Sequence, residues 1–254
     1  VLVIGGGGRE HALCLGLSQS NLIAQIHCTP GNAGIAGVAN IHSVSASDLS
    51  GLVNLSENIG VDFVVVGPEA PLCLGLSDAL SEKGIPCFGP CKSHARLEGS
   101  KLYAKEVMQN IGVPTAQFRK IQTMQEAEDA LEAFSGKPWV IKRDVLAGGK
   151  GVVVSEDRDE VMNFIASSIS TDGYVLVEEF LPGEEASLLV VMDAGEFVCL
   201  PASQDHKREF DGDKGRNTGG MGAYAPAPVF DGSVESKAIE NIVKPMHQLS
   251  LIHI

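Results

Sequence analysis

Hydrophobic positions in the first ninety residues alternate between short apolar runs and longer stretches in which apolar and polar residues mix. The runs are typical of strands buried in a parallel sheet, and the mixed stretches between them are typical of helices. We therefore predict strands at 1–4, 23–29, 63–66 and 86–89. Helices are predicted at about 9–17, 48–58 and 74–83, the second with Asp48 as its N-cap. This alternation predicts a doubly wound parallel sheet with right-handed crossovers.

The loops that follow the predicted strands are the candidate binding region of this first part. Ligands of doubly wound sheets bind at the carboxyl ends of the strands. Those ends lead here into loops rich in glycine and proline, at 5–10, 30–34, 67–71 and 88–90. We expect these loops to form one site.

The second part of the chain mixes helices and strands in a different order. Its predicted strands lie at 118–121, 139–142, 152–154 and 174–181, and an antiparallel pair lies at 186–192 and 196–201. Its predicted helices lie at about 93–110, 126–134, 158–169 and 233–247. We expect residues from about 114 to 180 to form a small α+β unit beside the first sheet.

Composition excludes several classes of partner. The 254 residues suffice for one or two domains, and 19 basic against 32 acidic residues argue against nucleic acid. The chain shows no signal peptide and no apolar run of the roughly 20 residues that a membrane span needs. Its six cysteines lack the spacing of a zinc site. We expect a cytoplasmic protein without nucleic-acid or membrane partners, and a few residues before Val1, which is not a methionine.

A glycine-rich loop between two β-branched runs is the strongest chemical signal. Lys142 ends the first run, the loop contains Gly148, Gly149, Lys150 and Gly151, and the second run follows at once. Glycines let backbone N–H groups approach an anion, and the two lysines add positive charge. The P-loop pattern is absent, so we interpret the loop as a phosphate cover between two strands. The alternative is a tight hairpin whose lysines are incidental.

The loop after the first strand suits a single phosphate group. A dinucleotide fingerprint that starts at Gly5 needs glycine where Glu10 stands, and no acidic residue ends the second strand. A dinucleotide-dependent oxidoreductase is therefore disfavoured. What remains is a glycine turn at a helix N-terminus with Arg9 beside it. The alternative is a turn whose glycines serve only strand–helix packing.

Two polar stretches complete the candidate chemistry. Glu178 and Glu179 end a predicted strand, and Glu184 and Glu185 follow a Pro-Gly turn. A free strand edge can bind adenine, and a carboxylate just beyond it can bind ribose hydroxyls, although a solvated acidic turn would look the same. The segment 204–222 is polar and rich in glycine, which indicates a ligand-binding segment or, alternatively, a flexible surface loop.

Nine stretches, in order along nearly the whole chain, resemble the glycinamide ribonucleotide synthetase (phosphoribosylamine–glycine ligase) family of the ATP-grasp superfamily. They are VLVIGGGGREHA (1–12), PGNAG (30–34), VVVGPEAPL (64–72), CFGP (87–90), SKLYAK (100–105), GVPTA (112–116), LAGGKGV (146–152), EEFLPGEEAS (178–187), and QDHKR with NTGGMGAYAP (204–226). The resemblance implies an α/β fold: an N-terminal parallel doubly wound (pre-ATP-grasp) sheet at 1–100, then an incomplete α+β ATP-grasp domain at 101–254 whose segment 114–180 is a mobile lid.

The resemblance implies ATP-dependent joining of glycine to 5-phosphoribosylamine through glycyl phosphate, in purine biosynthesis. It implies three groups of site residues. Those implied for ATP are Lys101, Lys142, Gly148, Gly149, Lys150, Gly151, Glu178, Glu179, Phe180, Leu181, Glu184 and Glu185. Those implied for the sugar phosphate are Gly7, Gly8, Arg9, Glu10, Asn32, Gly34, Pro68 and Glu69. Those implied at the reaction centre are Asp205, Lys207, Asn217, Thr218, Gly219 and Gly220.

The chain departs from the family pattern in three places. Arg143 and Val145 flank Asp144 where alanine and glycine are usual, which we expect to stiffen or shift the hinge of the loop, and Arg216 replaces a usual proline. The chain also stops before the residues that hold Mg²⁺ or Mn²⁺ in the family, and residues 249–254 no longer resemble it. We therefore expect a truncated or mis-joined reading frame and a fragment without ligase activity of its own. The alternatives left open are another ATP-grasp carboxylate–amine ligase and a module that binds ATP without turnover.

Overall fold

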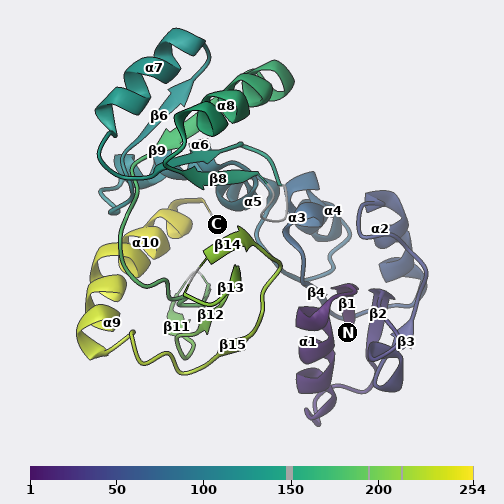
Figure 1. Ribbon diagram of the computed structural model, residues 1–254. Helices are drawn as coiled ribbons and strands as arrows, with labels where there is room; N and C mark the ends of the chain where they lie inside the picture. The colour runs from purple at the N-terminus through teal and green to yellow at the C-terminus, as the bar shows by residue number, and fades with distance from the viewer. Residues whose placement is uncertain (147–150, 194, 213, 254) are drawn as a thin grey trace. The chain divides into compact units, whose positions relative to one another are not determined.

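The structure is a computed structural model that describes residues 1–146, 151–193, 195–212 and 214–253. The chain divides into two compact units, Val1–Gly99 and Ser100–Ile254 (Figure 1). Within the described residues, no helix combines the length and the apolar character needed to cross a lipid bilayer.

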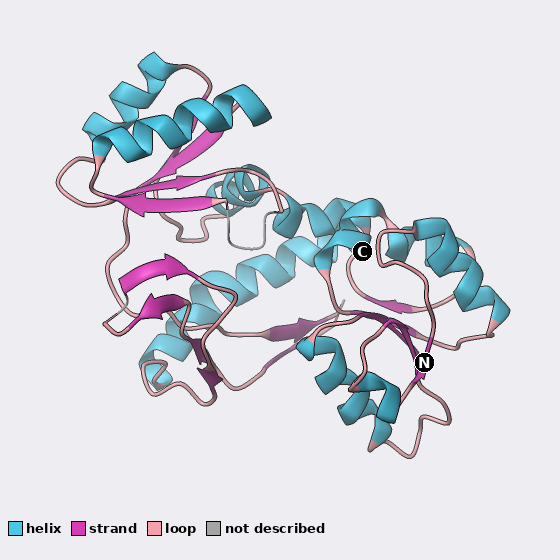
Figure 2. Cartoon of the chain, turned by 45° about the vertical axis from the view of Figure 1, so that its right-hand side comes forward, coloured by secondary structure: helices cyan, strands magenta, loops and turns pink. Residues whose placement is uncertain are grey.

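The first unit is built on a five-stranded parallel sheet, which confirms the predicted class of sheet (Figure 2). Its strands lie in the order β3-β2-β1-β4-β5, and every neighbouring pair is parallel. Their bounds are β1 Leu2–Gly5, β2 His27–Pro30, β3 Asn40–Ile41, β4 Val64–Val66 and β5 Cys87–Phe88. The second strand is shorter than predicted, and β3 was not predicted, because two residues carry too little pattern to be recognised.

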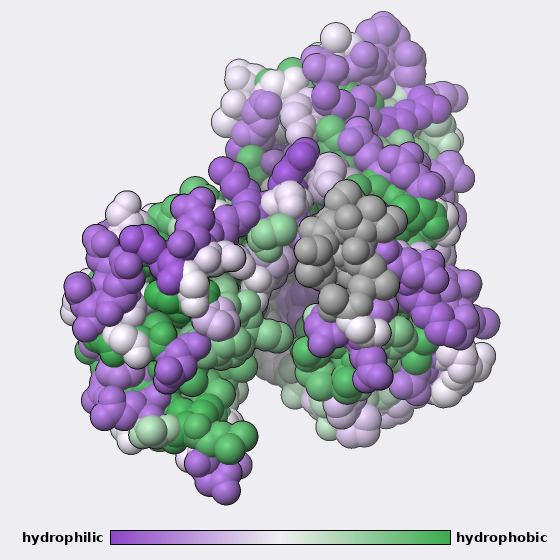
Figure 3. Space-filling model, turned by 180° about the vertical axis from the view of Figure 1, so that it is seen from behind, coloured by the Kyte–Doolittle hydropathy of each residue, from purple (hydrophilic) through white to green (hydrophobic). Residues whose placement is uncertain are grey.

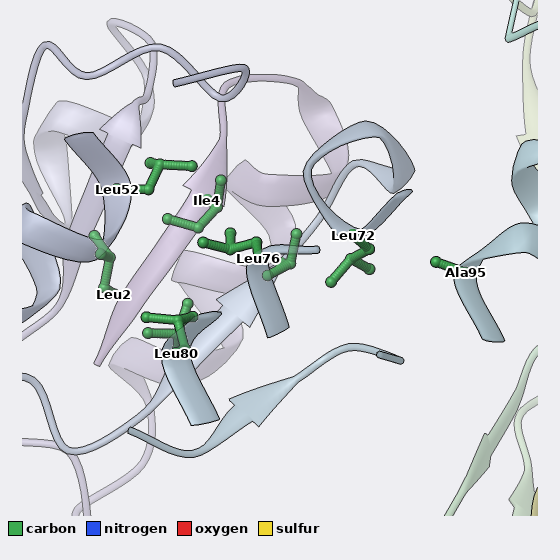
Figure 4. Packing of buried hydrophobic residues seen from close by; sticks show 9 residues of the cluster. Leu2, Ile4, Leu52, Leu72, Leu76, Leu80 and Ala95 are labelled. Carbon is green, nitrogen blue, oxygen red and sulfur yellow. The ribbon is translucent and has the colours of Figure 1, made fainter. Parts of the chain in front are cut away.

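Helices cover both faces of this sheet because alternate residues of each strand point to opposite sides. Leu2 and Ile4 of β1 pack with residues of α2 and α4, whereas Val3 packs with residues of α1. Figure 4 shows Leu2 and Ile4 close to Leu52 and Leu80, all fully buried. Each such side chain contributes about 1.5–3 kcal/mol of transfer free energy. The helical elements are α1 Gly8–Ser18, η1 Ile35–Gly37, α2 Leu49–Asn58, α3 Glu69–Leu74, α4 Leu76–Glu82 and α5 Lys92–Gly99.

The pattern missed one helix and one helix break. The helix predicted at 74–83 corresponds to α4, whereas α3 was not predicted; Gly75, whose φ of 103° lies in the left-handed region that glycine favours, separates the two. The helix predicted at 93–110 is divided at Ser100, whose extended backbone and hydroxyl cap the second half by accepting from the N–H of Tyr103. The prediction at Asp48 is confirmed, since its carboxylate accepts from the N–H of Gly51.

The second unit begins with a four-stranded antiparallel sheet in the order β6-β9-β7-β8. Helices α7 and α8 pack on it, and Leu131 and Ile165 meet Ile141 and Val177 in its core (Figure 1). The paired strands β7 and β8 confirm the two strands predicted on either side of the glycine-rich loop, with Lys142 opposite Val152. The elements are α6 Lys101–Asn110, β6 Phe118–Ile121, α7 Met124–Ala133, β7 Trp139–Lys142, β8 Val152–Ser155, α8 Arg158–Asp172 and β9 Val175–Glu178.

The rest of this unit consists of three short antiparallel pairs and a helical segment. The pair β10–β11 confirms the predicted antiparallel pair in shorter form and exposes Leu189, Val191 and Val198. Figure 3 shows hydrophobic residues in green intermingled with hydrophilic residues in purple on the face opposite to that of Figure 1. The elements are β10 Val190–Met192, β11 Phe197–Cys199, β12 Gln204–Asp205, β13 Arg208–Phe210, β14 Lys214–Asn217, β15 Ala223–Tyr224, α9 Gly232–Ala238, η2 Ile239–Val243 and α10 Lys244–His253.

Candidate functional site

The glycine turn after β1 opens helix α1 at one edge of the parallel sheet. Gly7 is the N-cap of α1, and both Gly7 and Gly8 are exposed. The first N–H groups of a helix lack intrahelical partners and attract anions. Arg9 lies on the same turn, and its guanidinium donates to the carbonyl of Gly67 after β4. This turn therefore has the donors that a phosphate group needs.

Glu10 is buried, whereas the three residues before it are exposed. Its side chain is 5% exposed, and its carboxylate accepts from the N–H of Gly7 at 2.6 Å. A Cβ added at Gly67 would lie 2.0 Å from its Oε1 atom, so the carboxylate sits against the loop after β4. Glu10 thus ties two strand ends together and holds the turn in shape.

Asn32 also links loops. Its amide nitrogen donates to the carbonyl of Gly6 at 3.0 Å, and its oxygen accepts from the N–H groups of Gly34 and Ile35. Pro68 is the N-cap of α3 and Glu69 is its first residue. The eight predicted sugar-phosphate residues therefore lie at the ends of β1, β2 and β4, on the same edge of the sheet.

In the second unit, one buried carboxylate joins two lysines. Glu178, at the end of β9, has a side chain that is 2% exposed. Its Oε2 atom lies 2.9 Å from Nζ of Lys105 and 3.0 Å from Nζ of Lys142. Its Oε1 atom is buried and has no hydrogen-bond partner among the described residues. An unsatisfied buried acceptor is costly, so this oxygen is a candidate to accept a hydrogen bond from a ligand.

Asp144, just after β7, organises the start of α6. Its carboxylate accepts from the N–H of Lys101 and from the hydroxyl of Ser100 at 2.8 Å. The ammonium of Lys101 in turn donates to the carbonyl of Val145 at 3.1 Å. These contacts hold Lys101, the first residue of α6, against the segment that follows Lys142 at the end of β7. Both lysines are predicted to bind ATP phosphates.

Tyr174 donates a hydrogen bond of 2.6 Å to the same carboxylate of Asp144. Burial, and then this bond, raise the pKa of Tyr174 to about 12. Since an unfolded tyrosine has a pKa of about 10, the native state keeps a proton that the unfolded chain loses. The stabilisation is thus complete below about pH 10 and is lost as the pH rises toward 12.

We expect the wild type to lose more stability than Tyr174→Phe between about pH 9 and about pH 11.5. Guanidinium unfolding followed by the fluorescence of Trp139, the single tryptophan, measures this difference. Comparison with the variant removes the contribution of the other titrating groups. Identical pH slopes for the two proteins would contradict the prediction.

The pairing of β6 with β9 becomes irregular just after Glu178. Glu179 donates its N–H to the carbonyl of Gln117, but the N–H of Gln117 donates to Oε1 of the Glu179 side chain. A regular antiparallel pair would use the main-chain carbonyl of Glu179 for this second bond. That carbonyl is therefore not used by Gln117, while Phe180 is half-buried and Leu181 is 61% exposed.

The two glutamates that follow the Pro-Gly turn, Glu184 and Glu185, differ in their contacts. Glu184 is exposed, whereas Oε1 of Glu185 lies 2.5 Å from Nζ of Lys207. Asp205 lies 3.6 Å from the same ammonium. The hydrogen bond to Glu185 raises the pKa of Lys207, and burial opposes it. Glu185 is thus engaged with a predicted reaction-centre residue, which leaves Glu184 as the better placed of the two for ribose.

The polar segment 204–222 is folded into two small antiparallel pairs, β12–β15 and β13–β14. The N–H of Thr218 donates to the carbonyl of Lys207 at 2.6 Å, and the Thr218 hydroxyl accepts from the N–H of Gly220. Gly219 and Gly220 are exposed. These contacts bring Asp205, Lys207 and Thr218–Gly220 together, and Asn217 joins them through the backbone of β14.

Part of the predicted site cannot be placed. Gly148, Gly149 and Lys150 lie outside the described residues, and so does the side chain of Asn217. Gly151 is described: it is buried, and its carbonyl accepts from the N–H of Arg143 at 2.8 Å. Among the described side chains, no group of three His, Cys, Asp or Glu residues could hold a metal ion.

Sequence reasoning missed Lys105 and Asp144. Lys105 follows Lys101 by one helical turn, so the spacing alone indicated that both lysines share a face of α6. The partner of Lys105 is distant in sequence, and nothing in the pattern indicated it. For Asp144, the sequence drew attention only to its neighbours Arg143 and Val145, which depart from the family pattern.

Comparison with solved structures identifies the class. The chain resembles the crystal structure of N5-carboxyaminoimidazole ribonucleotide synthetase from Thermus thermophilus, with a TM-score of 0.73 and 22% identity over 98% of this chain and 64% of that one. The crystal structure of phosphoribosylamine–glycine ligase from Thermotoga maritima matches with a TM-score of 0.79 and 33% identity, over 97% of this chain and 60% of that one. The fold is the α/β fold of ATP-grasp enzymes, as predicted.

Family profiles assign the chain more closely. Residues 1–98 match the phosphoribosylglycinamide synthetase N domain, and residues 99–250 match the phosphoribosylglycinamide synthetase ATP-grasp (A) domain. The chain therefore belongs to the phosphoribosylglycinamide synthetase family.

Curated relatives carry the name phosphoribosylamine–glycine ligase. The protein from Streptomyces coelicolor is 49% identical over 96% of this chain and 58% of its own length. The protein from Caulobacter vibrioides is 44% identical over the same shares of the two chains. The chain thus spans somewhat more than half the length of the relatives it matches.

Proposed function

We propose that the polypeptide to which this chain belongs joins glycine to 5-phosphoribosylamine with ATP, forming glycinamide ribonucleotide, ADP and phosphate. The proposal rests on the family and on the name that its relatives carry. The chain's own part is to bind the sugar phosphate at the first unit and the nucleotide at the second. The same proposal includes two domains, 1–100 and 101–254, a mobile lid at about 114–180, and a cytoplasmic location.

The observation that carries the nucleotide site is the buried acceptor of Glu178 beside a partly exposed lysine. Oε1 of Glu178 and the main-chain carbonyl of Glu179 are two acceptors at one strand end, which suits the exocyclic amine of adenine. Lys142 uses one donor on Glu178 and is 31% exposed, so it retains donors for a phosphate. Lys101 adds a second charge at the start of α6. Phosphoryl transfer needs such positioning and charge neutralisation.

The turn at Gly7–Arg9 is proposed for the phosphate of the ribosylamine. Free N–H groups of α1 and the guanidinium of Arg9 supply donors and positive charge. Glu10 and Asn32 act by holding the loops rather than by touching the ligand, because Oε2 of Glu10 and both side-chain amide atoms of Asn32 already bind backbone groups. This refines the proposed roles of these two residues.

The reaction centre is proposed at Asp205, Lys207 and Asn217–Gly220. ATP-grasp ligases use Mg²⁺ or Mn²⁺, which supplies further neutralisation of phosphate charge, and no group of three His, Cys, Asp or Glu among the described residues could hold the ion. We assign no step of this chain to the ion. The other ATP-grasp ligases remain a second candidate that no observation favours.

Isothermal titration of the 254-residue chain with ADP, GDP and ribose 5-phosphate tests the proposal. We expect ADP and ribose 5-phosphate to bind independently and GDP to bind at least about tenfold more weakly than ADP, because its carbonyl cannot donate to Glu178. Equal affinities for ADP and GDP, or no binding of ribose 5-phosphate, would contradict it.

A further inference from the structure

Lys105 of α6 is a buried lysine whose ammonium has three partners in the second unit. It is 7% exposed, and its ammonium lies 2.9 Å from Oε2 of Glu178. The same ammonium donates to the hydroxyl of Thr115 and to the carbonyl of Ala116, both at 3.1 Å. An ammonium has three donors, and all three are used. Lys105 therefore has no donor left for a ligand.

The charges of the cluster do not cancel. Lys105 and Lys142 contribute two positive charges against one negative charge on Glu178, and both lysines share the same oxygen, Oε2. Sharing divides the attraction of that oxygen between two ammonium groups. Lys142 is thereby held less tightly than in an isolated pair, and its side chain is 31% exposed where that of Lys105 is 8% exposed.

We propose that Lys105 is a positioning residue for nucleotide phosphates, acting on them through Glu178 and Lys142. It fixes the carboxylate of Glu178 from the buried side and keeps the cluster net positive. Lys142 can then turn its remaining donors to an anion without leaving Glu178 as an uncompensated buried charge. This proposal rests on the proposed nucleotide site. It assigns to Lys105 an effect on the phosphates of the nucleotide, not on its adenine.

The first test of this role does not depend on nucleotide. In Lys105→Met, Glu178 keeps Lys142 as its single lysine, so Oε2 of Glu178 holds the ammonium of Lys142 more closely and makes it less accessible to reagents. We expect acetic anhydride to label Lys142 at least about threefold more slowly in the variant, measured by peptide mass spectrometry of the folded 254-residue chain. Lys120, which lies over the ring of Tyr174, is the internal reference. An unchanged or faster rate at Lys142 would overturn the proposal.

The second test compares ligands with and without phosphates. We expect Lys105→Met to weaken ADP about tenfold and adenosine less than about twofold, measured by titration calorimetry. Lys120→Met removes a lysine charge from neighbouring strand β6 and is expected to change neither affinity by more than about twofold. Equal losses for ADP and adenosine would mean a merely structural role and would overturn the proposal.

A double variant guards against misfolding. In a Glu178→Gln chain, Lys105 has no carboxylate to hold, so adding Lys105→Met should weaken ADP by less than about twofold further. Full additivity of the two effects would overturn the proposal. If the unaltered chain fails to bind ADP, the proposed function fails, and the labelling rate of Lys142 still decides whether Lys105 controls that lysine.

Discussion

Replacing Glu178 with alanine is expected to lower the free energy of unfolding of the sheet β6–β9 by about 3–5 kcal/mol. The substitution removes the one carboxylate that both Lys105 and Lys142 contact. Lys105 then remains almost fully buried, with only the hydroxyl of Thr115 and the carbonyl of Ala116 as partners. An uncompensated buried ammonium is far more costly than the loss of an exposed ion pair. Urea unfolding followed by the fluorescence of Trp139, which lies in β7, measures the effect.

A matched change at an exposed carboxylate separates this effect from a general loss of negative charge. Glu184→Ala lies on the turn after the same strand and is expected to change the free energy of unfolding by less than about 0.5 kcal/mol. Glu178→Gln keeps the shape of the side chain without its charge and should fall between the two. A loss below about 1 kcal/mol for Glu178→Ala would refute the buried ion cluster.

Replacing Lys142 with methionine is expected to weaken ADP by about 10- to 100-fold, the value of one charge-assisted hydrogen bond to a phosphate. Stability should change little, because Glu178 retains Lys105 as its partner. Lys142→Met thus loses ADP affinity while keeping its free energy of unfolding, whereas Glu178→Ala loses free energy of unfolding. Titration calorimetry with ADP gives the affinity, and unfolding followed by Trp139 gives the stability.

Control measurements make this prediction specific to the phosphates. Lys120→Met should leave ADP binding within about twofold of wild type, since its ammonium lies over the ring of Tyr174. Adenosine, which has no phosphate, should bind Lys142→Met about as well as it binds the unaltered chain. A similar loss for adenosine and ADP would place Lys142 away from the phosphates.

Periodicity was sufficient for the class of fold because most of the longer elements carry their own pattern, whereas the two-residue strand β3 does not. All-apolar strands indicated a sheet buried on both faces, and Figures 1 and 2 show the resulting first unit. The errors lie where a local conformation interrupts a continuous pattern. Ser100 divides the helix predicted at 93–110, because an extended backbone at one residue leaves the hydrophobic spacing almost unchanged, and the short helix α3 before Gly75 was not predicted.

Candidate site residues were recognised where a residue type is unusual for its place, as with the glycines of the first loop or the adjacent Glu178 and Glu179. Their division into ligand-binding and supporting roles was not recognisable. Glu10 and Glu185 have the same side chain, yet one is buried against backbone N–H groups and the other pairs with Lys207. Only contacts distinguish them.

The amino-acid sequence by itself determined the α/β class and most of the order of the elements, and it indicated the stretches proposed to carry the chemistry, because these depend on short-range patterns of side-chain size, polarity and backbone freedom. The tertiary structure decided which charges meet. Lys105 reaches Glu178, and Asp144 reaches the start of α6 and Tyr174, across long separations in the chain. Electrostatic interactions depend on distance through space and on burial, and chain packing alone sets both.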